Sequence, residues 1–381
     1  MIYFDNSATT MQKPPGVAQA VMQAIGTYGN AGRSFCDPAI EATRAVFRAR
    51  KEVATLVKLE NPLQVAFTSG STESLNLVLN SLLTAEDHVI TTVLEHNSVL
   101  RPLYKIGCEI SYINCDDAGY LQLDSLSELL KQQTKCIICT HGSNVLGTIT
   151  NVKQLFRFCK ENGLLLILDV SQTMGAIETY ADMGDILCFT GHKALFGPQG
   201  TGGIIVGEQN SMKQPFKLVK TGGSGEHSFA PHQSLTMPDI FEAGTVNAHG
   251  LAGLQQGIAY VNHRGIADVA RQEAVLFDHL LQGVKEIRGI ELYGATPDRD
   301  REHLPVIALN IKGLPAEEVS YQLWDRWQIA TRPGSHCAPL LHERFGTKER
   351  GMVRISLTIF NTLQEVQTAV EALWMIASGK G

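Results

Sequence analysis

Lys193 and Asp169 are the residues whose types and placement indicate chemistry most directly. The stretch CFTGHKALFGPQGTGG, residues 188–203, puts Lys193 in a polar turn right after an apolar run, and GLLLILDVSQ puts Asp169 at the end of a run of Leu and Ile. Burying an unpaired carboxylate is costly, so Asp169 needs a cation or several hydrogen-bond donors. A lysine that forms a Schiff base and an aspartate that pairs with a pyridinium nitrogen are what pyridoxal phosphate requires. We therefore expect a pyridoxal phosphate site here.

A place for the phosphate of such a cofactor is expected at residues 68–74, TSGSTES. Ser71 and Thr72 open an expected helix, whose free N–H groups and positive dipole end suit an anion. Ser and Thr also begin many helices simply as caps, so this signal is weak when taken alone. Thr190 and His192, from the polar turn that carries the lysine, strengthen it.

Cys337 lies in TRPGSHCAPL, residues 331–340, where Pro333 and Gly334 interrupt any helix or strand, so we place it on a loop. Two other cysteines, Cys136 and Cys139, form a CxxC in the strand-like KCIICTHG. There they face opposite sides of a sheet, and no second CxxC completes a metal site, so we expect no metal centre. The remaining cysteines are Cys36, Cys108, Cys115, Cys159 and Cys188.

The bulk composition is that of an ordinary globular protein. The 381 residues are 44% hydrophobic and 18% charged, and the net charge of −6 with no long Lys/Arg cluster argues against a broad nucleic-acid surface. No apolar run reaches the roughly 18 residues of a membrane-spanning helix. The start, MIYFDNSATT, lacks the pattern of a signal peptide. We therefore expect a cytoplasmic protein that binds neither nucleic acid nor membranes.

The segments that must position these residues alternate between short apolar runs and helical patterns. The expected strands are LQVAFTSG, DHVITTV, CEISYINC, KCIICTH, LLLILDV, DILCFTG and GGIIVG. Nearly uninterrupted apolar strands separated by helices indicate an α/β fold with a mostly parallel sheet covered on both faces. Ligands of such sheets bind beyond the carboxyl ends of the strands, where Lys193 and Asp169 are expected.

The chain is expected to form a large α/β domain, residues 13–251, and a smaller C-terminal α+β domain, residues 252–381, with residues 1–12 packed on the latter. From about residue 252 a helix-rich stretch leads to IELYG, LPVIALNIKG and VRISLTIFN. A last helix then begins at Thr362, with Glu365 three residues on, which is the pattern of a capping box. The smaller domain carries the Cys337 loop.

The ordered set of motifs resembles the class V aminotransferase family. The set comprises YFDNSATT, FTSGSTES, EHNS, HGSNVLGT, LDVSQ, GHKALFGPQGTGG, FEAGT, GSHCAP and RISL, and it runs from residue 3 to residue 357. Within that family it is most similar to the cysteine desulfurases, on the branch that includes selenocysteine lyase-type enzymes. The resemblance implies a fold-type I pyridoxal-phosphate enzyme with a large and a small domain.

The resemblance also implies roles around the cofactor. Lys193 would hold it covalently, Asp169 would pair with its ring nitrogen, and His96 would stack on the ring and assist proton transfer. Asn144 and Gln172 would hydrogen-bond near its phenolic oxygen. The phosphate would be held by Ser71, Thr72, Thr190 and His192 and, across the interface of a homodimer with shared sites, by Thr245.

For the substrate, the resemblance makes Arg354 the clamp for the carboxylate of L-cysteine or L-selenocysteine, with Asn6, Ser7 and Ala8 along the pocket. Cys337 would attack the substrate sulfur, keep it as a persulfide and leave L-alanine. A sulfur-acceptor protein or a small thiol would then take the persulfide sulfur. Iron–sulfur cluster assembly, thiolation of RNA and selenium delivery are all open as its destination.

The loop motif of that branch resembles R-x-G-x-H-C-A-x-P, and this sequence departs from it. Pro333 and Ser335 stand where other residues are usual, and Pro339 comes one position early, which could alter the stiffness of the loop.

Three alternatives to a cysteine desulfurase stay open: a selenocysteine lyase, a class V aminotransferase, epimerase or kynureninase-like hydrolase without persulfide chemistry, and a non-catalytic scaffold. The presence of Lys193, Asp169 and His96 together argues against the scaffold.

Overall fold

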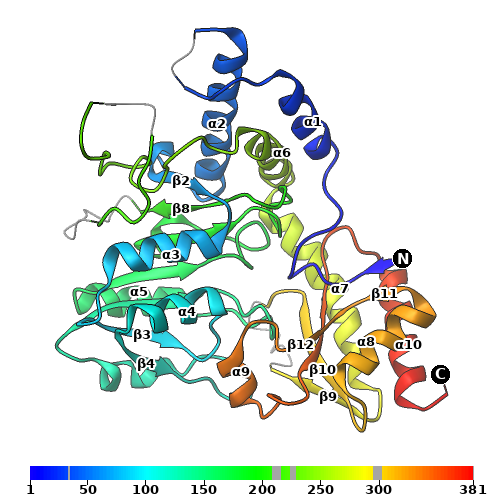
Figure 1. The fold of residues 1–381 in the computed structure, drawn as a ribbon. Helices are drawn as coiled ribbons and strands as arrows, with labels where there is room; N and C mark the ends of the chain where they lie inside the picture. The colour runs from blue at the N-terminus through cyan, green and yellow to red at the C-terminus, as the bar shows by residue number, and fades with distance from the viewer. Residues whose placement is uncertain (33–34, 208–215, 224–228, 295–302, 381) are drawn as a thin grey trace.

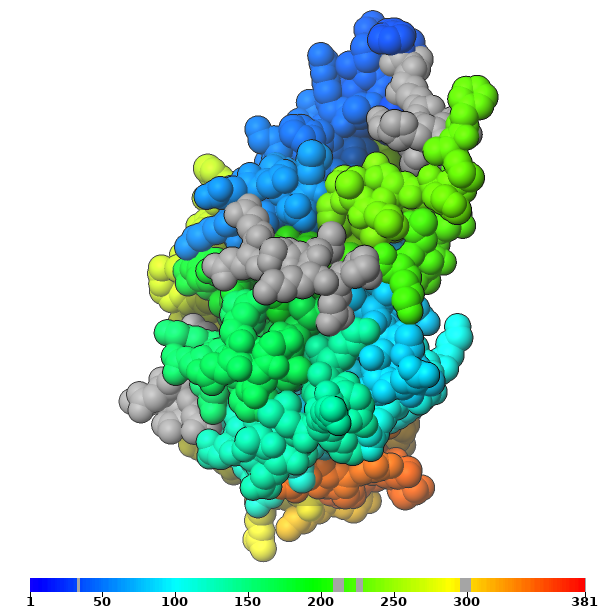
Figure 2. Space-filling view, turned by 90° about the vertical axis from the view of Figure 1, so that its left-hand side faces the viewer, coloured from blue at the N-terminus to red at the C-terminus, as the bar shows by residue number. Residues whose placement is uncertain are grey.

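The computed structural model describes residues 1–32, 35–207, 216–223, 229–294 and 303–380. The molecule is elongated. Figure 1 shows the N-terminal helices at one end, the large sheet in the middle and the C-terminal domain at the other end, and Figure 2 shows the same order from the side. Among the helices of these residues, none has the length together with the apolar character that crossing a bilayer requires.

A seven-stranded sheet forms the centre of the large domain. Its spatial order is β2 (Val65–Thr68), β8 (Gly202–Val206), β7 (Ile186–Thr190), β6 (Leu165–Asp169), β5 (Thr134–Thr140), β3 (His88–Thr92) and β4 (Glu109–Ile113). β8 runs antiparallel to its neighbours β2 and β7, and the other neighbouring strands pair in parallel. The predicted α/β fold with a mostly parallel sheet is confirmed.

Helices cover both faces of this sheet because its strands carry apolar residues on both sides. In β6, Leu166 and Leu168 pack in the core on one face, and Ile167 packs in the core on the other. Cys136 and Cys139 of β5 are likewise split between the two cores, as their spacing predicts. The first core holds α2 (Asp37–Leu56), α5 (Val152–Glu161) and α6 (Ala248–Arg264), and the second holds α3 (Ser71–Leu82) and α4 (Asn97–Ile106).

The C-terminal domain is built on a four-stranded antiparallel sheet with the order β12 (Arg332–Gly334), β13 (Met352–Ser356), β10 (Val306–Ile311) and β9 (Ile290–Tyr293). Its core includes residues of α7 (Ile266–Lys285), α8 (Ala316–Trp327) and α10 (Leu363–Ala377). The N-terminal segment joins this domain, since β1 (Ile2–Tyr3) pairs in parallel with β11 (Ile329–Ala330) and Phe4 lies in the same core.

The predicted capping box at the start of α10 is confirmed. The Thr362 hydroxyl oxygen accepts a hydrogen bond from the Glu365 N–H at 3.2 Å, and a Glu365 carboxylate oxygen accepts one from the Thr362 N–H at 2.9 Å. The remaining described helices are α1 (Val17–Thr27), α9 (Pro339–Arg344) and the short 3₁₀ helices η1 (Pro62–Gln64), η2 (Leu123–Leu129) and η3 (Ala181–Met183).

We propose that the two domains divide at Gly265. The boundary expected between residues 251 and 252 falls inside α6, and the whole of α6 packs along α1 and α2 of the large domain. Gly265, with a φ of 85°, separates α6 from α7, which packs on α10 of the smaller domain. A helix that belongs to one core is a poor place for a boundary, whereas a glycine between two helices lets the chain change direction.

Candidate active site

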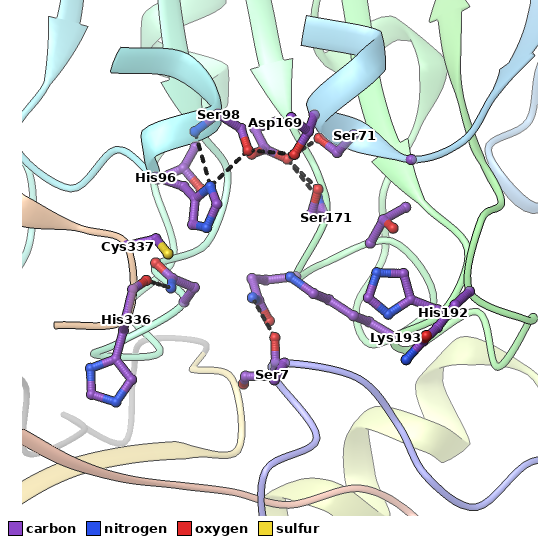
Figure 3. Close-up of a pocket in the computed structure, with 18 of the residues that line it drawn as sticks. Ser7, Ser71, His96, Ser98, Asp169, Ser171, His192, Lys193, His336 and Cys337 are labelled. Atoms are coloured by element: carbon purple, nitrogen blue, oxygen red, sulfur yellow. Dashed lines mark hydrogen bonds between the residues drawn. The ribbon is translucent and has the colours of Figure 1, made fainter. Parts of the chain in front are cut away.

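A cavity of about 420 Å³ lies at the carboxyl ends of β5, β6 and β7. Thr140, Asp169 and Thr190, the last residues of those strands, line it, and the C-terminal domain contributes Cys337 (Figure 3). This is the edge at which ligands of α/β sheets bind. The predicted site residues that line the cavity are Ser7, Ala8, Ser71, Thr72, His96, Asn144, Asp169, Gln172, Thr190, His192, Lys193, Cys337 and Arg354.

Asp169 is held by serine hydroxyls and a main-chain N–H at the end of β6. Its Oδ1 accepts hydrogen bonds from the Ser71 hydroxyl at 3.1 Å and from the N–H and hydroxyl of Ser171 at 3.0 and 2.5 Å (Figure 3). These donors offset part of the cost of burying the carboxylate. Oδ2 has no hydrogen bond within the described residues, so it is available to a cationic donor in the cavity, such as a protonated ring nitrogen. The Ser71 hydroxyl, expected at the phosphate, is here bonded to Asp169.

His96 sits directly before α4 and caps its first turn. Its Nδ1 accepts a hydrogen bond from the Ser98 N–H at 3.0 Å, so the proton of the neutral ring is on Nε2. Burial lowers the pKa of His96, with Lys193 adding to the shift and Asp169 opposing it. The Ser98 hydroxyl also lies 2.7 Å from that of Thr72, which ties the position of the His96 ring to the start of α3.

Lys193 lies in the turn after β7, and the N-terminal segment forms hydrogen bonds to this turn. The main-chain carbonyl of His192 accepts hydrogen bonds from the Thr10 N–H at 3.1 Å and from Nζ of Lys13 at 3.0 Å. Burial lowers the pKa of Lys193 to about 8, and Asp169 opposes that shift. Within the described residues no acceptor bonds its Nζ, so the amine is available to form a covalent bond with a cofactor.

The start of α3 forms the part of the cavity expected to hold a phosphate. It lies tightly against β8, since a Cβ at Gly202 would come within 2.5 Å of the Gly70 Cα. The first N–H groups of any α-helix lack intrahelical acceptors. In the same cavity the His192 Nδ1 is buried without a partner among the described residues, and burial lowers the pKa of His192 to about 4. These unsatisfied polar groups fit the phosphate of pyridoxal phosphate.

Arg354, on β13, reaches the cavity with two of its nitrogens already bonded. Nη1 donates to the Asn144 carbonyl at 3.0 Å, and Nη2 donates to Oδ1 of Asp5 at 2.6 Å. Nε has no partner within the described part of the chain, so further guanidinium N–H groups are available to a carboxylate. Asp5 also lies 3.7 Å from Arg332, a second arginine that lines the cavity.

The Cys337 loop is held in an uncommon backbone conformation. His336 and Cys337 have φ values of 49° and 57°, the left-handed region that non-glycine residues rarely adopt. Two donors from the large domain fix it: the Asn97 N–H bonds the Cys337 carbonyl at 2.7 Å, and the Asn144 side chain bonds the His336 carbonyl at 2.9 Å. The thiol itself is exposed. Pro339 is the first residue of α9, a position that suits proline.

His336 does not supply a positive charge beside the thiol. Burial lowers its pKa to about 3, and the nearby Arg354 adds to that shift, so the ring is neutral. One ring nitrogen bonds the Arg332 carbonyl at 2.9 Å, and Figure 3 shows the imidazole on the other side of the loop from the Cys337 sulfur. The His336 ring therefore supports the loop rather than contacting the cavity centre.

Comparison with known proteins places this geometry in a family. A family model described as aminotransferase class-V matches residues 2–369. The chain belongs to that family. It is 32% identical to a probable cysteine desulfurase of Pyrococcus abyssi (98% of this chain, 93% of the relative) and 31% identical to a cysteine desulfurase of Yersinia pestis (99% and 93%).

Solved structures of the family have the same fold. The apo structure of a cysteine desulfurase from Thermococcus onnurineus is similar over 99% of this chain and 95% of that chain, with a TM-score of 0.91 and 31% identity. A cysteine desulfurase from Escherichia coli, 24% identical with a TM-score of 0.85, shares the fold over 97% of this chain and 93% of that chain. The predicted fold-type I architecture is confirmed.

Besides Ser71 and Asn144, two predicted residues have contacts other than the expected ones, and a third lies outside the cavity. Asn6 lies outside the cavity, and its side-chain amide donates to the Ser356 carbonyl at 2.9 Å, so it anchors the N-terminal segment. Gln172 lines the cavity but donates to the Ser7 carbonyl at 3.1 Å. Thr245 lies along a neighbouring hollow, so its role at the phosphate of a partner subunit stays a prediction.

The buried thiols are poor candidates for chemistry. Cys136, Cys139 and Cys188 are fully buried, and burial raises the pKa of each well above the usual range of a thiol. Burial likewise raises the pKa of Cys115 to about 11 and that of Cys159 to about 12. The described residues contain no group of three or more side chains that could hold a metal ion.

Sequence reasoning missed three residues of the site. Ser98 and Ser171 each follow a predicted residue by two positions, in EHNS and DVSQ, and that local spacing could have indicated them. Asp5 contacts an arginine 349 positions away along the chain, so no local pattern could have paired them.

Proposed function

We propose that this protein is a pyridoxal-phosphate-dependent cysteine desulfurase that converts L-cysteine to L-alanine and leaves the sulfur as a persulfide on Cys337. The observation that carries the proposal is that an exposed thiol, Cys337, and the amine of the half-buried Lys193 line one cavity. The relatives reported above are named cysteine desulfurases, which favours this activity over a selenocysteine lyase and over an aminotransferase or epimerase.

The side chains that line the cavity have the chemistry that the cofactor needs. Lys193 would bind it covalently, the unbonded oxygen of Asp169 would take its ring nitrogen, and the His96 ring would lie against its ring. The start of α3 and the unpartnered nitrogen of His192 would take the phosphate, together with Thr190. When bound, pyridoxal phosphate supplies an electron sink for the bonds that the reaction breaks.

In the substrate half of the cavity, Arg354 would bind the carboxylate of L-cysteine through its remaining N–H groups, a role suited to a planar guanidinium. The Lys193 amine would take the proton from Cα. Once the Cβ–Sγ bond has broken, Cβ and Cα each take up one proton, and these two are the proton taken from Cα and the proton that the Cys337 thiol gives up on becoming a thiolate. The Cys337 thiolate would attack the substrate Sγ, so that an S–S bond forms as the Cβ–Sγ bond breaks. The exchange balances without an added oxidant, since L-cysteine and the Cys337 thiol become L-alanine and a persulfide.

The sulfur acceptor must come to Cys337, because the loop is fixed at two carbonyls by the Asn97 N–H and the Asn144 side chain. The thiol is exposed, so an acceptor protein or a small thiol can reach it. We also propose a homodimer in which Thr245 contributes to the phosphate site of the second subunit.

The test is to detect the sulfur on the chain. The holoenzyme is mixed with L-cysteine without a reductant, alkylated and digested, and the masses of its peptides are measured by mass spectrometry. We expect one added sulfur atom on the peptide with Cys337 and none on the peptide with Cys36, the other exposed cysteine of the described residues. Formation of L-alanine without added sulfur on Cys337 would contradict the proposal.

A further inference from the structure

Asp5 connects the two arginines at the substrate end of the cavity. Its Oδ1 accepts a hydrogen bond from Arg354 at 2.6 Å, and its Oδ2 lies 3.7 Å from Arg332. Both arginines line the cavity, whereas Asp5 is not among its lining residues and belongs to the N-terminal segment, which bridges to Ser356 of β13. Asp5 therefore neutralises arginine charge without itself lining the cavity.

Arg354 does not need Asp5 to keep its place. Its side chain is only 3% exposed, it belongs to the central region of the small-domain sheet on β13, and Nη1 is bonded to the Asn144 carbonyl at 3.0 Å. Replacing Asp5 by its amide would thus leave the guanidinium in position but without its charged partner. The main consequence of that change is electrostatic.

The charges around this end of the cavity determine how strongly it attracts an anion. Arg332 and Arg354 together carry two positive charges, and Asp5 removes one of them. A ligand carboxylate bound to Arg354 would share that arginine with Asp5, and two carboxylates on one guanidinium repel each other. Asp5 therefore stabilises the arginine charges when the site is empty, and it repels the ligand carboxylate when the site is filled.

We propose that Asp5 is an internal counter-ion that limits how tightly the cavity holds the carboxylate of an amino acid. The inference rests on the proposed function, in which L-cysteine enters and L-alanine leaves with the same carboxylate. By weakening the hold on that group, Asp5 speeds the release of L-alanine. Asp5 acts through the charge of Arg354 and does not touch the reacting atoms, so it is not a catalytic residue.

The experiment compares two amines that differ by the carboxylate. L-alanine and ethylamine are titrated into the holoenzyme, and binding is followed through the absorbance of the bound cofactor. For Asp5→Asn we expect the dissociation constant of L-alanine to fall by about tenfold or more, the size of a like-charge interaction at an effective dielectric constant of about 20. The constant for ethylamine should stay within about twofold, because it has no carboxylate to be repelled.

Two further variants separate charge from folding. Asp117→Asn removes a carboxylate that pairs with Arg344 at 2.7 Å on the surface, and it should change neither constant. Arg332→Gln changes a half-exposed side chain and removes one of the two positive charges near Asp5. Only the charge of Arg354 then balances Asp5, so L-alanine should bind several-fold more weakly. This second variant keeps the test decisive if the Asp5 variant does not fold.

The outcomes distinguish this inference from the proposed function. If Asp5→Asn binds L-alanine no better than the wild type, or if Arg332→Gln leaves L-alanine binding unchanged, the counter-ion role is wrong. If the wild type itself binds L-alanine no better than ethylamine, the carboxylate site at Arg354 is wrong, and with it the substrate part of the proposed function.

Discussion

Replacing Asp169 by asparagine tests the cofactor site through a single charge. The change keeps the size of the side chain and one carbonyl oxygen, which can still accept hydrogen bonds from Ser71 and Ser171. It removes the negative charge and puts an amide where Oδ2 faces the cavity. We therefore expect the empty protein to fold as before and the loaded enzyme to lose the counter-ion of the cofactor's ring nitrogen.

The size of the loss follows from the charge. An opposite charge within a few ångströms shifts a pKa by about 1–3 units, and each unit is worth about 1.4 kcal/mol. Without Asp169 the protonated ring nitrogen loses about 1.4–4 kcal/mol, so alanine formation should slow by about 10- to 1000-fold. The free energy of unfolding of the apo protein should change by less than about 1 kcal/mol, because the asparagine oxygen keeps its donors.

The matched control is Asp185→Asn, at the opposite end of the same strands. Asp185 is also buried, and it accepts hydrogen bonds from the Leu166 N–H at 2.8 Å and the Lys160 amine at 2.7 Å. The Asp185→Asn variant should lose about 1–3 kcal/mol of unfolding free energy, measured in urea, and keep its turnover per bound cofactor. Equal turnover per bound cofactor in the Asp169 variant and the wild type would refute the assignment of Asp169.

Two other predictions follow from buried charges. Because burial lowers the pKa of Lys193 to about 8, the rate at which the apo protein captures pyridoxal phosphate should rise with pH around a midpoint of about 8 and level off above it. The rate is measured by rapid-mixing absorbance, and a midpoint near the pKa of 10.5 of free lysine would contradict this. Glu242→Ala removes the partner of Arg50 (2.5 Å, side chains 10% and 7% exposed) and should cost about 3–5 kcal/mol in urea unfolding. Glu41→Ala, which breaks an exposed pair with Arg44, should leave the free energy of unfolding nearly unchanged. Equal losses from the two variants would show that the buried pair stabilises the fold no more than the exposed one.

Much of the site could be predicted because its residues follow apolar strands. Asp169 is the last residue of β6 and Lys193 lies in the turn after β7, and the carboxyl ends of neighbouring parallel strands must meet at one edge. The start of α3 was predicted for the same reason, since Ser71 follows β2 closely. The alternation of buried side chains likewise placed Cys136 and Cys139 in separate cores.

The rest depends on contacts between distant segments. The antiparallel direction of β8 appears in its pairing with β7 and β2, and an apolar run alone does not encode it. The bond between Asp5 and Arg354 requires the N-terminal segment to cross the small domain. The domain boundary that we propose at Gly265 likewise depends on packing, because the pattern of α6 does not say which core buries it.

The most direct test of the central claim is the release of L-alanine and sulfide from L-cysteine in the presence of a reductant. Wild type, Cys337→Ala and Cys36→Ala are compared at equal cofactor content. We predict equal amounts of both products from the wild type and the Cys36 variant, and neither from the Cys337 variant. Equal rates from all three proteins would contradict sulfur transfer through Cys337.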